Sequence, residues 1–277
     1  MPHSSLTASG MAHIWQILLG NLAMVALVIT GWAHLTPSIR PRFGLSREAY
    51  FGMTMGIGAV ISMAMSAEIE PGVYFDLRAG LVVSAALFGG AVAAVFTSVM
   101  AVAFRLWMSG AGVTIGVAGI VIAALLSLLA RKVAGSKILF GHVAVVALAQ
   151  SAAAYLIGSS SISPLHHLGG AVAVAAVGLN FFCILVSGFI ILKVRRIRTE
   201  RDLLRAALAQ SPDFYYVKDR KSRFRFANEA VARFNKFDSP AGMIGLSDFD
   251  LTQNHRAAEL FEEERRIMAS GSPLLDQ

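Results

Sequence analysis

Long apolar runs and short polar interruptions alternate over the first two thirds of the chain. Six such runs stand out, at residues 14–35, 47–67, 79–104, 111–130, 138–157 and 168–192. A helix needs about 20 apolar residues to cross the hydrocarbon core of a bilayer. Barrel strands alternate over about ten residues, and these runs are longer and more evenly apolar. The pattern predicts a polytopic α-helical membrane bundle of about six spans, which we assign to residues 1–192.

Charge separates this part from the rest of the chain. Residues 1–192 hold 8 Lys or Arg and 4 Asp or Glu, whereas residues 193–277 hold 16 and 13. The second part is therefore soluble in character. The net charge of +7 is not gathered on one face apart from residues 193–205, so we expect no nucleic-acid partner. No Lys or Arg precedes the first run, which we expect to be a retained span.

Basic residues near the ends of the runs predict orientation. Six of them follow the last run, namely Lys193, Arg195, Arg196, Arg198, Arg201 and Arg205. We therefore expect a cytoplasmic C-terminus, and six spans place the N-terminus and the loop with Asp76 and Arg78 on that side too. The loop with Arg40, Arg42 and Arg47 then falls outside, against the rule. A re-entrant run is one explanation, which the sequence leaves open.

The stretch PGVYFDLRAG, residues 71–80, places an acid and a base beside the membrane. In one interpretation Asp76 caps the next helix and Arg78 extends its charge to the interface. In the other, the two form a polar anchor or a ligand contact at the mouth of the bundle, because ionisable groups near hydrocarbon are costly unless paired. Glycine pairs within the runs predict tight helix packing: Gly52 and Gly56, Gly89 and Gly90, Gly112 and Gly116, Gly169 and Gly170.

PGVYFDLRAG, LFGG at 87–90 and FRLWMSGAGVTIGVAG at 104–119 together resemble the LytS-like five-transmembrane receptor domain (5TMR-LYT type) of bacterial sensor proteins. The resemblance covers roughly residues 40–195. It implies a role in signal reception, and its signature positions here are Pro71, Gly72, Asp76, Arg78, Arg105, Gly110 and Gly112. One departure is Met108-Ser109 before Gly110, where the family pattern leads us to expect a glycine pair, so that a different local turn is expected.

Residues 193–210 are predicted to form a linker helix. Val194, Ile197, Leu204 and Leu208 follow a 4-3 alternation with Ile190 and Arg201, which is the pattern of a short coiled-coil seam. A solvated helix with an apolar stripe gives a similar pattern over so few turns. The seam makes a homodimer a reasonable expectation, and the lipid bilayer is the other expected partner.

Residues 211–277 predict a mixed α+β unit. Tyr215 and Val217 alternate on one strand, Phe224 and Phe226 on a second after a charged turn, and a helix starts near Asn228. Another amphipathic helix ends at Gly271. The order resembles the N-terminal part of a cytoplasmic PAS domain. This resemblance implies missing strands, so we expect an incomplete domain, with any PAS ligand unknown.

Chemistry-bearing residues are sparse. Cys183 lies alone in an apolar run and is expected to be a small buried residue. His166 and His167 are adjacent and lack a third ligand, and His255 is best explained as a surface residue. No nucleophile with a base, phosphate loop or carboxylate pair is recognisable, so we expect no catalytic residue, no metal and no evident cofactor.

Two functions of different classes remain. The first is the sensory input region of a bacterial inner-membrane signalling protein, responding to an unknown small molecule or membrane state. By resemblance its output domain, beyond residue 277, is a diguanylate cyclase or alternatively a histidine kinase. The second is a multi-span transporter, which should carry buried charge in both halves. Residues 138–192 carry no Asp, Glu, Lys or Arg, which favours the sensor.

Overall fold

The computed structural model describes residues 8–35, 45–70, 72–135, 137–160, 170–251 and 256–272. The chain divides into two compact units, Met1–Arg195 and Arg196–Gln277. They are described separately below as the membrane unit and the soluble unit. The helix α7, Gly170–Gln210, contributes to both.

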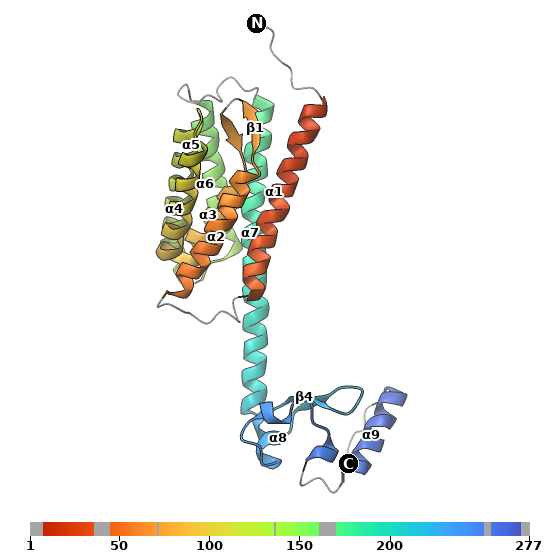
Figure 1. The fold of residues 1–277 in the computed structure, drawn as a ribbon. Coiled ribbons are helices and arrows are strands. Elements are labelled where there is room, and N and C mark those ends of the chain that lie inside the picture. The colour runs from red at the N-terminus through yellow and green to blue at the C-terminus, as the bar shows by residue number, and fades with distance from the viewer. Residues whose placement is uncertain are drawn as a thin grey trace. The chain divides into compact units, whose positions relative to one another are not determined.

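The membrane unit is a helical bundle with one small β-hairpin (Figure 1). In chain order its elements before α7 are α1 Ala8–Leu35, α2 Arg47–Ala64, β1 Ala67–Glu70, β2 Val73–Phe75, α3 Arg78–Ser84, the π-helix η2 Ala85–Gly89, α4 Gly90–Met108, α5 Val113–Ala134 and α6 Phe140–Ser159. We call the end of the bundle with β1 and β2 the hairpin end. The opposite end, where Arg195 lies, is the exit end.

Five helical segments of the described residues, not the six predicted, are long and apolar enough to cross a membrane: His13–Ala33, Arg78–Met108, Val113–Ala134, Phe140–Ser159 and Val174–Gln210. The predicted run 47–67 is not among them. Its helix α2 has only 18 residues and begins with Arg47 and Glu48. Even so, α2 belongs to the bundle, because it packs along α1 and α4.

The segment Arg78–Met108 is not one straight span, because it doubles back at Gly90. A straight helix would separate Arg78 from Arg105 by about 40 Å. Both guanidinium groups instead lie beside Gly116 of α5, where an added Cβ would be 2.7 Å from Nε of Arg105 and 3.1 Å from Nη2 of Arg78. Gly90 makes the reversal with φ 80° and ψ −164°, a conformation essentially confined to glycine.

This reversal corrects the predicted arrangement of the chain ends. Nδ2 of Asn21, midway along α1, donates a hydrogen bond to the carbonyl of Ser62, near the end of α2. Trp32, late in α1, stacks on Phe51, near the start of α2. The helix α1 therefore begins at the hairpin end. Six spans predicted that the N-terminus and the Asp76 loop share a side with the exit of α7. The start of α1 and the Asp76 loop lie at the opposite end instead.

Glycines in the bundle act in two ways, of which the sequence predicted one. Gly52 lets α2 approach α4 closely, since a Cβ there would be 2.6 Å from the carbonyl oxygen of Ala93. Thr97 of α4 donates to the carbonyl of Gly52 at 2.8 Å. Gly90 and Gly116, by contrast, provide a turn and room for arginine side chains rather than helix packing.

The soluble unit contains the predicted local elements. The strands β3 Tyr216–Lys218 and β4 Phe224–Ala227 pair antiparallel, followed by α8 Glu229–Phe234, two short 3₁₀ turns, η4 Pro240–Met243 and η5 Asp248–Asp250, and α9 Ala257–Ser270. The side chain of Asn228 caps α8 by accepting from the N–H of Val231 at 3.2 Å. Gly271 ends α9 with φ 67°, as predicted.

The burial of the first strand of the soluble unit could not be read from its pattern. Tyr215 and Val217, whose alternation predicted an apolar face, are both exposed. Lys218 is buried instead, and its ammonium group pairs with the carboxylates of Asp248 and Glu264. Burial alone would lower the pKa of Lys218, but the hydrogen bonds that its ammonium group donates to both carboxylates outweigh burial, so its pKa is raised.

Candidate functional site

The hairpin end is closed by contact between two glycine turns. The β1–β2 hairpin turns at Gly72, whose φ is 76°, and the α4–α5 connection turns at Gly110, whose φ is 95°. The N–H of Gly112 donates to the carbonyl of Gly72 at 3.2 Å. The N–H of Gly72 in turn donates to Oε1 of Glu68 at 2.9 Å. The hairpin is thus fixed onto the connection by backbone contacts.

Asp76 and Arg78 lie below this hairpin, at the start of α3. Oδ1 of Asp76 accepts from the backbone N–H of Arg78 at 2.9 Å, and Oδ2 forms an ion pair with Nη1 of Arg78. The side chain of Asp76 is 1% exposed and that of Arg78 16%. One carboxylate group thus accepts from a backbone donor at the helix start and pairs with the arginine, and a ligand contact at this pair stays a prediction.

Arg105, near the end of α4, reaches the same place and is 2% exposed. Its Nη1 donates to the carbonyl of Ser109 at 3.0 Å, and its guanidinium lies 5.6 Å from the centre of the Tyr74 ring. No carboxylate forms an ion pair with Arg105 among the described side chains. The carboxylate of Asp76 pairs with Arg78 alone, so the two arginines leave an excess positive charge at this place.

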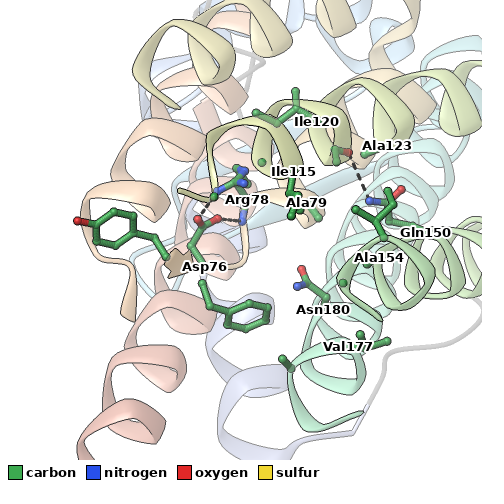
Figure 2. Close-up of a pocket in the computed structure, with 18 of the residues that line it drawn as sticks. Asp76, Arg78, Ala79, Ile115, Ile120, Ala123, Gln150, Ala154, Val177 and Asn180 are labelled. Atoms are coloured by element: carbon green, nitrogen blue, oxygen red, sulfur yellow. Dashed lines mark hydrogen bonds and ion pairs between the residues drawn. The ribbon is translucent and has the colours of Figure 1, made fainter. Parts of the chain in front are cut away.

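A cavity of about 430 Å³ lies beside these groups. Asp76, Arg78 and Arg105 line it at the hairpin end, and most of the remaining wall is apolar, from α3, α5, α6 and α7 (Figure 2). Volumes of this order accommodate small organic molecules. The apolar wall with a charged end suits a molecule that carries an anionic group on an otherwise uncharged body.

Two amides interrupt the apolar wall. Gln150 of α6 is 6% exposed, and its Nε2 donates weakly to the carbonyl of Gly119 at 3.5 Å. Asn180 of α7 also lines the cavity. Oε1 of Gln150 and Oδ1 of Asn180 are buried, and neither accepts a hydrogen bond from any described residue. Sequence reasoning missed both residues, although a polar amide within an apolar run was a usable signal.

A second group of contacts lies at the exit end. The reversal at Gly90 leaves the last carbonyls of η2 without helical partners. Nη1 of Arg131, from α5, donates to the carbonyl of Leu87 at 2.8 Å. Nη2 of Arg195, from α7, donates to the carbonyl of Phe88 at 3.0 Å. The segment α3–η2 therefore joins the cavity at one end to α7 at the other.

The predicted signature positions come together at the hairpin end, with one exception. Pro71 lies outside the described residues, as do His166, His167 and His255. Cys183 is fully buried against Gly80, in keeping with the prediction of a small buried residue. Of the predicted linker positions, all in α7, Ile197 and Leu204 are exposed in the single chain, whereas Val194 and Leu208 are partly covered. No cluster of metal-ligating side chains occurs in the described part of the chain.

Comparison with protein families gives one match. The model described as the 5TMR of 5TMR-LYT matches residues 32–194, which is more than half of the chain and contains the whole cavity. The chain belongs to the 5TMR-LYT family. Its membrane unit is thus a membrane sensor region of a signal transduction protein. Neither the comparison with curated proteins nor that with solved structures finds a match.

The described signature residues of the family each have a structural role in this chain. In this 5TMR-LYT chain the glycines at 72, 110 and 112 fix the hairpin, the pair Gly89 and Gly90 forms the reversal, and the charged residues line the cavity. At Met108-Ser109, where a glycine pair was expected, Ser109 adopts φ 56° and ψ −162°. The turn keeps the glycine-like geometry despite the different residue.

Proposed function

We propose that the chain senses a small anionic molecule in the cavity at the hairpin end and passes the signal along α7 to a cytoplasmic output domain. The observation that carries the proposal is the excess positive charge of Arg78 and Arg105 over Asp76 beside an apolar cavity. A ligand carboxylate or phosphate would neutralise that charge, and arginine binds such groups in bidentate geometry.

The distribution of basic residues supports an orientation with the exit end in the cytoplasm. Six Lys or Arg residues lie at that end, namely Arg47, Arg131, Lys132, Lys137, Lys193 and Arg195. At the hairpin end the two arginines line the cavity, and the hairpin itself carries Glu68. The positive-inside rule then places the cavity toward the outside. The conflict at Arg40, Arg42 and Arg47 disappears, because α1 ends and α2 begins at the exit end.

The segment α3–η2 is the natural route for the signal. Its first residue, Arg78, contacts the cavity, and Phe88 accepts the hydrogen bond from Arg195 of α7. A ligand changes the balance of two states only by binding one of them better. We propose that ligand binding favours one position of α3–η2, and that Arg195 transfers this preference to α7.

Contacts within the soluble unit support a signal path that continues beyond the end of α7. The amide of Asn228, 1% exposed, donates to the carbonyls of Leu208, Ser211 and Asp213 at the end of α7. The resemblance of this unit to a PAS domain, and the heptad pattern of α7, favour a homodimer that controls an output domain. We favour a diguanylate cyclase as that domain, with a histidine kinase as the alternative.

One observation favours the transporter alternative. The broken helix around Gly90 is a feature that many transporters use at their substrate sites. Inverted repeats, however, need a matching broken helix in the second half, and α5 and α6 run without interruption. Because α5 and α6 have no such break, and because the chain belongs to the 5TMR-LYT family, we favour the sensor.

Thermal unfolding of the full chain in detergent tests the ligand proposal. A panel of small carboxylates and phosphate esters is added, and we expect at least one to raise the unfolding temperature. A ligand at about 100 times its Kd stabilises by about 2.7 kcal/mol. Arg78→Gln and Arg105→Gln should lose the shift, and the matched variant Arg131→Gln at the exit end should keep it. Equal shifts in all four proteins, or none in the unsubstituted chain, would contradict the proposal.

A further inference from the structure

We infer that Tyr74 is a positioning residue of the anion site, whose ring holds the guanidinium of Arg105 beside the cavity without neutralising its charge. This inference rests on the proposed function and adds a residue to it. Tyr74 belongs to β2, so the β1–β2 hairpin becomes part of the site rather than only its cover.

The two arginines at the cavity are held in different ways. Arg78 forms an ion pair with Asp76, which neutralises the charge of Arg78. Arg105 lies over the ring of Tyr74, with 5.6 Å between its Cζ and the ring centre. An aromatic ring attracts a cation through its quadrupole and carries no net charge. The positive charge that an anionic ligand would meet is therefore that of the arginine held by the ring.

The remaining contacts of Arg105 leave one edge of its guanidinium open. Nη1 donates to the carbonyl of Ser109 at 3.0 Å. Nε and Nη2 donate to no described residue, and neither is among the fully covered polar atoms of the described residues that lack a partner. Both donors therefore keep accessible surface, and Arg105 lines the cavity. A carboxylate or phosphate bound along this edge would accept from both donors, in the bidentate geometry that arginine offers.

The hairpin fixes the place of the ring. Tyr74 pairs with Glu68 across the two strands, and the N–H of Gly112 donates to the carbonyl of Gly72 at the hairpin turn. A side chain that is already held in place loses less conformational freedom when a ligand binds, which increases affinity. The seated hairpin thus prepares Arg105 for the anion through the ring of Tyr74.

Ring substitutions test the inference in the full chain. Thermal unfolding in detergent is measured with acetate, butyrate, hexanoate, benzoate and phenyl phosphate as probes. For a probe that stabilises the unsubstituted chain, Tyr74→Phe should keep the affinity because it keeps the ring. Tyr74→Leu should bind about threefold to tenfold more weakly, the range that one cation–π contact supplies. Leucine remains apolar, so this pair of variants separates the ring from simple apolar packing.

Fluorination provides a readout that a merely structural role would not change. Mono-, di- and trifluorinated phenylalanine at position 74 keep the shape of the ring and progressively weaken the negative potential of its face. The affinity for the probe should fall stepwise along this series. The same residues at Phe182, which is exposed on α7 and does not line the cavity, should leave the affinity unchanged.

The outcomes separate this inference from the proposed function. If Tyr74→Leu and the fluorinated chains bind the probe as tightly as the unsubstituted chain, or if Tyr74→Phe loses as much affinity as Tyr74→Leu, the inference is wrong while the anion site stands. If Tyr74→Leu does not fold, the fluorinated series decides alone. If no probe stabilises the unsubstituted chain, both the inference and the proposed function fail.

Discussion

A Cβ added to Gly110 would lie 2.6 Å from the carbonyl oxygen of Gly72. The two residues are far apart in sequence, and both have positive φ. Contact between them seats the β-hairpin on the α4–α5 connection, above Asp76 and Arg105. The position of the hairpin beside the cavity thus depends on two positions where no side chain fits.

Gly110→Ala should therefore open the hairpin end. The added methyl group meets backbone atoms, which cannot rotate away, and the positive φ adds strain, so we expect a loss of about 2 kcal/mol or more. Thermal unfolding in detergent measures the loss. Gly141→Ala in α6 is the matched control, because a Cβ there meets nothing within 4 Å. Equal effects of the two substitutions would contradict the described contact.

At Ser109 we expect a substitution by glycine to increase the stability of the membrane unit, in contrast to the loss expected for Gly110→Ala. Its φ of 56° and ψ of −162° are essentially confined to glycine. Ser109→Gly should stabilise the membrane unit by about 1 kcal/mol, because the strain disappears while the carbonyl that binds Arg105 remains. The control is Ser160→Gly, at φ −68°, where glycine should give no gain. An unchanged or lower unfolding temperature for Ser109→Gly would count against the strained turn.

Cysteine labelling in intact cells checks the orientation. In a Cys183→Ala background, a cysteine at Glu68 in the hairpin should react with a membrane-impermeant maleimide added outside. A cysteine at Lys137, at the exit end, should react only after the cells are permeabilised. The reverse pattern would place the cavity toward the cytoplasm and would contradict the proposed direction of signalling.

Cross-linking checks the proposed dimer. Ile197 and Leu204 are exposed on α7 in the single chain, and an apolar heptad seam is buried only by a partner helix. Cysteines at Ile197, Leu204 or Leu208 should form disulfide-linked dimers in membranes under mild oxidation. A cysteine at Thr199, on the opposite face of the helix, should not. If all four positions behave alike, α7 has no seam.

Some of this architecture was predictable from the sequence. Apolar runs predicted the membrane bundle, and local patterns predicted β3, β4, the start of a helix near Asn228 and the end of α9 at Gly271. The start of α3 at Arg78 followed from the preceding turn. Each of these depends on neighbours in sequence, which pattern analysis captures.

The features that failed depend on contacts distant in sequence. Run 79–104 looks like one span, and only the contacts of Arg78 and Arg105 with Gly116 reveal the reversal. Ala67–Glu70 and Val73–Phe75 form a hairpin that the sequence analysis missed, because both strands are short and adjoin apolar runs that predict helices. Gln150 and Asn180 gain significance only from the cavity that they share.

Filling the cavity tests the central claim most directly. A Cβ at Gly119 meets nothing within 4 Å, and Gly119 lines the cavity, so Gly119→Phe should fill the cavity from within. Gly178→Phe is the control, since a Cβ at Gly178 also meets nothing within 4 Å and Gly178 is not among the lining residues. Mass spectrometry of small molecules released from denatured, membrane-purified protein provides the readout. A small organic anion should be released from the unsubstituted chain and from Gly178→Phe, but not from Gly119→Phe. Release of the same anion from Gly119→Phe would show that the cavity is not the sensing site.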